Sequence, residues 1–156
     1  MPAASTPPAD LALRYEWREG SVPPPYHYEY TVRLGPGGQG EVVFRPDYAQ
    51  HDPPVWTEAF SVPGEALAGL YALLAEAGVF TRRWRRSPRL PIGGSTAWLE
   101  ATAGGRTVTV PAGLAQSQAA AIGAVYEAIR GLVPGAIWAK LLARRDDYRR
   151  AHAERT

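Results

Sequence analysis

Hydrophobic and polar residues alternate most clearly in YHYEYTVRL, residues 26–34, where tyrosine, valine and leucine take every second position. A period of two predicts a strand with one buried face. The glycine-rich GPGGQG that follows at residues 35–40 predicts a turn, and EVVFR at 41–45 resumes the alternation. Residues 26–45 are therefore predicted to form a β-hairpin. WTEAFSV, residues 56–62, predicts a further strand, and Leu11–Trp17 a first strand at an edge of the sheet.

The pattern changes to a helical period after Pro63, which suits the first position of a helix because proline lacks the N–H that would be unpaired there. The apolar stripe of this helix is Leu67, Leu70, Tyr71 and Leu74. Gly78 fits the stop position, where a left-handed conformation is wanted.

The second half repeats this order. TAWLEAT (96–102) and RTVTV (106–110) predict another hairpin, and residues 116–130 a helix. Its apolar face is Ile122, Val125, Tyr126 and Ile129. Pro134 breaks the chain, and a last amphipathic helix follows. The apolar side of that helix is Ile137, Trp138, Leu141, Leu142 and Tyr148.

Strands grouped with strands and followed by helices indicate an α+β fold. We expect an antiparallel sheet of about five strands from two hairpins, with helices packed on one face and an extra C-terminal helix. Residues 1–10 are predicted to be a disordered N-terminus, 11–133 a single α+β domain, and 134–156 the C-terminal amphipathic helix and tail. The apolar face of the last helix packs either on this domain or on a second copy, which would make a homodimer.

Composition narrows the chemistry. The 156 residues include no cysteine, which excludes disulfides, zinc–thiolate sites and cysteine nucleophiles. The N-terminus lacks the basic start and apolar run of a signal peptide, and no stretch of about 18 apolar residues is present. We therefore expect a cytoplasmic protein with no membrane contact, and the sequence points to no cofactor.

The segment from residue 82 to 89, RRWRRSPR, is the strongest local charge and is called the arginine loop below. It holds five of the sixteen arginines and no acidic residue. Arginine makes forked contacts with carboxylate or phosphate, and the central tryptophan could stack on a base or bury itself in a partner. The candidate partner-binding residues are Arg82, Arg83, Trp84, Arg85, Arg86 and Arg89.

Two other interpretations of the arginine loop stay open. Trp84 can instead turn inward and pin the loop, leaving its arginines solvated or paired with Glu76 and other carboxylates. The loop can also bind nucleic acid. The chain carries a net charge of only +2, so the residues outside this loop carry about −3 and do not extend a basic footprint. An acidic protein partner is therefore favoured over nucleic acid.

The sequence gives weaker indications of a metal site or of catalysis. Asp47, His51 and Asp52 share one loop, but His27, predicted to lie on the outward face of a strand, and His152 are not at ligand spacing. The sequence predicts no metal site and leaves open whether the three loop residues converge.

Glu58 is the one carboxylate predicted to share a face with aromatic residues, and an arginine is its expected partner. No nucleophile motif is present, so we predict that the protein is not an enzyme. An enzyme with an unrecognised site is the third alternative.

Two further patterns have structural explanations. GPGGQG is followed by a strand rather than a helix, so it predicts a turn and not a phosphate-binding loop. The stripe Tyr26, Tyr28 and Tyr30 resembles a base-stacking platform, but the aliphatic residues that continue it favour a core position beneath a helix.

The run VPGEALAGLYALLAEAGVF, followed by a loop and then GGSTAWLEATAGGRTVTVP, resembles small uncharacterised bacterial α+β domains, among them the emfourin-like proteins that inhibit metallopeptidases. The similarity covers roughly residues 27–132 and lies in the order of elements, so no inhibitory residue carries over. The resemblance implies a non-catalytic domain. We accordingly expect an uncharacterised binding module of bacterial type that contacts its partner through the arginine loop.

Overall fold

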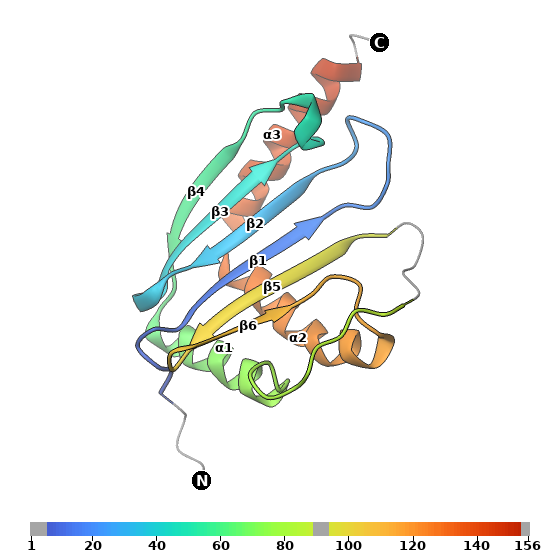
Figure 1. Cartoon of the computed structure of the whole chain (residues 1–156). Coiled ribbons are helices and arrows are strands. Elements are labelled where there is room, and N and C mark those ends of the chain that lie inside the picture. Colours follow the sequence, from blue (N-terminus) through green and yellow to red (C-terminus); the bar gives the residue numbers. More distant parts are fainter. Residues whose placement is uncertain (1–5, 89–93, 154–156) are drawn as a thin grey trace.

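The computed structural model describes residues 6–88 and 94–153, which form one antiparallel sheet covered by helices (Figure 1). The strand order is β4-β3-β2-β1-β5-β6. The strands are β1 (Ala12–Arg18), β2 (Glu29–Leu34), β3 (Gln39–Arg45), β4 (Trp56–Ser61), β5 (Thr96–Ala103) and β6 (Arg106–Val110). The helices are α1 (Gly64–Glu76), α2 (Gln116–Leu132) and α3 (Gly135–Ala153). The predicted α+β class is confirmed, with six strands where about five were expected.

Strand β1 lies in the middle of the sheet, and its prediction as an edge strand is wrong. It pairs with β2 on one side and with β5 on the other, so that Tyr15 lies between Val32 and Leu99. The pairing with β5 joins segments about 80 residues apart, and local periodicity carries no information on such a contact. The β2-β3-β4 meander and the β5-β6 hairpin therefore meet on β1.

The three helices cover the same face of the sheet. Viewed onto the open face, α3 lies behind β2 and β3, and α2 lies behind β5 and β6 (Figure 1). Alternate strand residues such as Leu13, Tyr15 and Phe44 are buried beneath the helices. The predicted apolar stripes supply the other side of the core, with Leu74 and Ile129 fully buried. The periodicity of two and the helical periodicity thus describe the two sides of one core.

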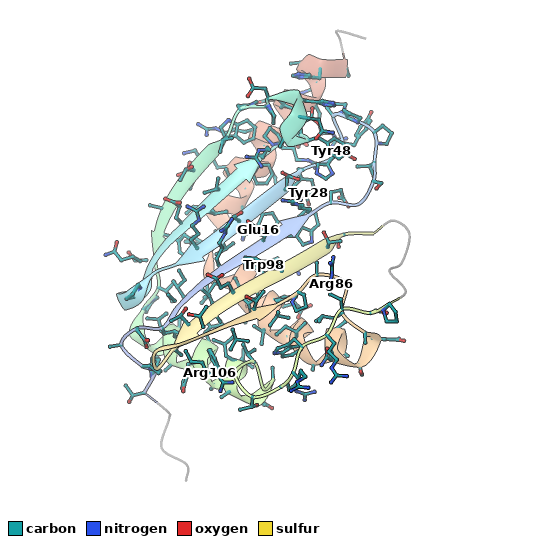
Figure 2. All side chains as sticks on the ribbon, viewed as in Figure 1. Glu16, Tyr28, Tyr48, Arg86, Trp98 and Arg106 are labelled. Atoms are coloured by element: carbon teal, nitrogen blue, oxygen red, sulfur yellow. The ribbon has the colours of Figure 1, made fainter. Side chains whose placement is uncertain are left out.

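The opposite face of the sheet carries a mixture of charges. Arg33 pairs with Glu41, and Arg14 pairs with Glu16, across or along the strands. Glu16 and Trp98 lie side by side on β1 and β5 (Figure 2). Positive and negative side chains therefore lie next to one another on this face.

Two glycines show why the predicted turns form where they do. Gly38, in the GPGGQG turn, has a φ of 86°, and a Cβ there would lie 2.3 Å from the carbonyl oxygen of Val62. Gly78 ends the first helix with a φ of 73°, as the sequence predicts. Both positions need a residue without a side chain.

The N-terminal segment is tied to the second hairpin. Within the stretch predicted to be disordered, the Asp10 carboxylate accepts hydrogen bonds from the amides of Gly104 and Gly105, each at 2.7 Å. These two bonds, that of Gly105 first, lower the pKa of Asp10. The turn between β5 and β6 is thereby fastened to the chain that enters β1.

Helices α2 and α3 meet at 87° across Val133 and Pro134. None of the helices in the described residues is long and apolar enough to cross a membrane alone, and only this bent pair passes by length and composition. Helix α3 packs on the sheet of its own chain, with Leu141 fully buried and the Trp138 ring 4.8 Å from that of Tyr30.

Candidate functional site

The arginine loop leaves the end of α1 with its tryptophan turned toward the protein. The Trp84 indole N–H donates to the carbonyl oxygen of Val79 at 3.0 Å, and its ring packs against the core. This placement matches the alternative in which Trp84 pins the loop. The indole is therefore part of the support of the loop.

Helix α2 fixes the backbone of the loop through Gln118. Its side-chain oxygen accepts from the Arg85 amide at 2.9 Å, and its side-chain nitrogen donates to the Arg83 carbonyl at 2.8 Å. Further along, the backbone amide of Ser87 donates to the Gly113 carbonyl at 2.7 Å, and Arg86 forms an isolated β-bridge with Leu114. The described part of the loop is thus held at several backbone positions although it belongs to no helix or strand.

The described arginine side chains of the loop are exposed to solvent. Within residues 6–88 and 94–153, none of the four described arginines of the loop forms an ion pair with a carboxylate, and Glu76 is not their partner. Arg86 makes only a long contact of 3.4 Å to the Ala112 carbonyl, beside the lower half of the sheet in Figure 2. Arg89 lies outside the described residues. All four described arginines are exposed: Arg82, Arg83, Arg85 and Arg86.

A second polar group lies where β2 begins and β3 ends, and there the prediction for His27 is wrong. His27 precedes β2 and is 4% exposed, because the Tyr48 ring stacks on it at 3.8 Å. Its Nε2 lies 3.0 Å from Glu29, which also accepts a hydrogen bond from Arg45 at 2.9 Å. Burial alone would raise the pKa of Glu29, but the bonds from His27 and Arg45 and the charge of Arg18 lower it below its usual value.

The loop residues weighed as metal ligands have structural partners. Asp47 is 2% exposed and accepts from the Tyr148 hydroxyl of α3 at 2.9 Å and from the Tyr48 amide at 2.7 Å. His51 lies 3.4 Å from the Asp47 carboxylate. In the part of the chain that the structure describes, no group of three or more His, Cys, Asp or Glu side chains has the arrangement of a metal site.

Glu58 has a partner, but a different one from the arginine that the sequence suggests. Its carboxylate lies 2.5 Å from Nζ of Lys140, the only lysine of the chain, on α3. The pair joins β4 to the helix above it. Glu58 is therefore part of the attachment of α3 to the sheet.

A cleft opens where α2 and α3 diverge, and the sequence predicts only some of the residues that line it. Its volume is about 490 Å³, and its floor is the sheet. We call it the aromatic cleft and define it by Tyr28, Tyr30, Phe44, Arg130, Trp138 and Leu142. The tyrosine stripe supplies two of these residues, and the third, Tyr26, is 47% exposed.

The tyrosines around the cleft are held as neutral phenols. Burial raises the pKa of Tyr15 to about 12 and raises those of Tyr28, Tyr30 and Tyr126. The positive charge of Arg130 opposes this rise of the pKa at Tyr15, Tyr28 and Tyr30. The sequence signal for the cleft was the tyrosine stripe, whereas the placement of Arg130 and Trp138 over it depends on the bend at Pro134.

Comparison with known proteins adds no relative. No protein-family model matches the chain, and no curated protein matches it.

Proposed function

We propose that this protein is a non-catalytic binding module that holds an acidic protein partner on the arginine loop. The proposal rests on one observation: the backbone of the arginine loop is held in place while its arginine side chains are exposed. Gln118 bonds to the backbone of both Arg83 and Arg85, while the arginine side chains beside them are exposed and unpaired with any carboxylate in the described residues. A site that is already ordered before binding loses less entropy when the partner arrives.

Charge distribution favours a carboxylate-bearing protein over nucleic acid. The guanidinium fork matches both carboxylate and phosphate, so the loop alone does not discriminate between them. Outside the arginine loop the chain carries a net charge of about −3, and the open face of the sheet alternates charge. A long polyanion would meet this acidic surface, whereas a compact acidic patch on a protein would not. The resemblance to inhibitors of peptidases fits a protein partner and stays a prediction.

The test compares two defined probes, a glutamate-rich peptide and a single-stranded DNA of similar charge, by fluorescence anisotropy over a salt series. One variant changes the four described loop arginines to glutamine. Its control changes four exposed arginines elsewhere, so that both variants have the same net charge. The control positions are Arg14, Arg33, Arg106 and Arg150.

We expect the peptide to bind more tightly than the DNA, and the loop variant to lose at least tenfold in affinity while the control keeps it. Gln118→Ala should weaken binding severalfold without any change of charge, since it releases the loop. Equal loss in both four-residue variants would show that net charge alone attracts the probe, and the proposal would fail. Tighter DNA binding, with a log–log salt slope near −3 from about 0.7 per phosphate contacted, would indicate nucleic acid instead.

A further inference from the structure

The aromatic cleft is a second candidate site, separate from the arginine loop. Its volume of about 490 Å³ is within the range of small-molecule sites, roughly 300–1,000 Å³. Its walls come from three elements: Tyr28 and Tyr30 belong to the sheet side, Arg130 to α2 and Trp138 to α3. Sites of this kind form between diverging helices because the side chains at a bend do not fill the space.

We propose that the aromatic cleft binds a small planar aromatic carboxylate, with its ring against Tyr30 and Trp138 and its carboxylate on Arg130.

The rings of the cleft are arranged to receive another ring. The Trp138 and Tyr30 rings form a T-shaped pair with centroids 4.8 Å apart, and both residues line the cleft. Tyr28 stacks against Phe44 at 5.5 Å and packs against Trp17 at 4.8 Å. Because both sets of rings are held by neighbours, a planar ligand gains stacking contacts without ordering the site first.

The charges of the cleft select an anion. Arg130 lines the cleft and is exposed. Arg145 follows Trp138 and Leu142 on the same face of α3, and its guanidinium lies 4.1 Å from the centre of the Tyr28 ring. Its buried Nε has no hydrogen-bond partner within the described residues. Among the described residues that line the cleft, Arg130 is the only cation, and its guanidinium can pair with a carboxylate.

A cationic ligand is disfavoured by the same arrangement. Aromatic rings can bind an organic cation, but Arg145 already occupies a face of Tyr28. A second cation would be repelled by Arg130 and Arg145. Glu127 also lines the cleft, one turn before Arg130 on α2.

The experiment uses three probes with one ring system: 2-naphthoate, neutral 2-naphthamide and cationic 2-naphthylmethylammonium. Binding is measured by calorimetry, and the amide shifts in NMR spectra locate the site. We expect naphthoate to bind most tightly and to shift residues around Tyr30 and Trp138. Arg130→Gln should weaken naphthoate about tenfold and leave naphthamide unchanged, because only the charged contact is lost.

Two controls separate this site from others. Arg106→Gln removes an exposed arginine at the far end of the sheet from Tyr28 and should not change naphthoate binding (Figure 2). The variant with four arginine-loop substitutions should bind naphthoate normally, so the two proposals can fail independently.

Leu142→Glu places a carboxylate in the cleft at a position that is 41% exposed, so the fold should tolerate it. We expect it to weaken naphthoate more than naphthamide. Three outcomes would overturn the proposal: no naphthoate binding at millimolar concentration, equal affinity for naphthoate and naphthamide, or full affinity in both Arg130→Gln and Leu142→Glu.

Discussion

Helices α2 and α3 cover the same face of one sheet, yet they attach to it by different interactions. Helix α2 buries Ile122, Val125 and Ile129, each at most 2% exposed, in the apolar core. Helix α3 buries only Leu141 to that degree. Ile137 and Trp138 pack against the core while partly exposed. The other attachments are cations on aromatic rings and polar bonds: Lys140 to Glu58, Arg144 on Trp56, Arg145 on Tyr28, Arg149 on Tyr26 and Tyr148 to Asp47.

The difference has consequences for how firmly each helix is held. Apolar burial is insensitive to salt, and each buried aliphatic side chain contributes roughly 1.5–3 kcal/mol. Exposed cation–π contacts contribute about 0.5–1 kcal/mol each, and surface ion pairs about 0–1 kcal/mol. Helix α3 is therefore held by many weak contacts that fix its direction, and α2 by a few strong ones. The aromatic cleft lies between the two helices.

The largest loss of folding free energy should come from removing a buried side chain of α2. Ile129→Ala removes a fully buried side chain of α2 and should lower the free energy of unfolding by about 3 kcal/mol. Urea denaturation followed by circular dichroism measures it. The matched change in α3, Leu142→Ala, at a position 41% exposed, should cost less than about 0.5 kcal/mol. Similar losses in the two variants would contradict the distinction between the helices.

Tyr148→Phe breaks the most buried polar contact of α3. The buried Asp47 carboxylate then loses the hydroxyl donor at 2.9 Å, which should cost about 2 kcal/mol. Hydrogen exchange of α3 amides should speed up while that of α2 is unchanged. An equal rise of the exchange rate in both helices would show that α3 does not open more independently than α2.

At low pH, the contacts around Glu29, where β2 begins, should weaken before the contacts that hold α2. The folded pKa of Glu29 is below its usual value of 4.5, so its contribution to stability is complete well above pH 4.5 and is lost as the pH falls through the folded pKa. Glu29→Gln should remove about 1 kcal/mol at pH 7 and flatten this acid limb. Thermal melts between pH 3 and 7 check it, and an unchanged slope in the variant would assign the acid limb to other carboxylates.

The smallest effect should be at the ion pair of Lys140 and Glu58. Its lysine side chain is 52% exposed, so Lys140→Met should change the free energy of unfolding by about 0.5 kcal/mol. The effect should vanish in 1 M NaCl, which separates it from the Ile129→Ala effect. A salt-independent loss would mean that the aliphatic stem of Lys140, rather than its charge, holds the helix.

Much of the fold follows from local pattern. Strand β6 begins and ends where the alternation predicts, at Arg106 and Val110, and α1 stops before Gly78 because only a left-handed glycine satisfies that end. The position of β1 does not follow, since pairing with β5 depends on contacts between distant segments. The sequence allows a loop pinned by Trp84, because this side chain is apolar and large. Nothing in the local sequence predicts that Gln118 holds the backbone of the loop.

The attachment of α3 shows a different limit. A hydropathy pattern assigns arginine to solvent and leucine to the core, so it places Leu142 inward and the arginines outward. In the structure Leu142 is 41% exposed at the cleft, and Arg145 lies on the Tyr28 ring. A guanidinium packs its flat face on an aromatic ring while keeping its edges polar, and no hydropathy scale contains that property.

The central position of β1 sets a waiting time during synthesis. Once β1 has emerged from the ribosome, the edge that pairs with β5 stays open until β5 is made, about 80 residues later. At 5–20 residues per second that interval is roughly 4–16 seconds. During it, the edge that carries Tyr15 and Trp17 can pair with another nascent chain. For this chain, the speed of translation through residues 19–95 is therefore a factor in how much of the protein reaches its native fold.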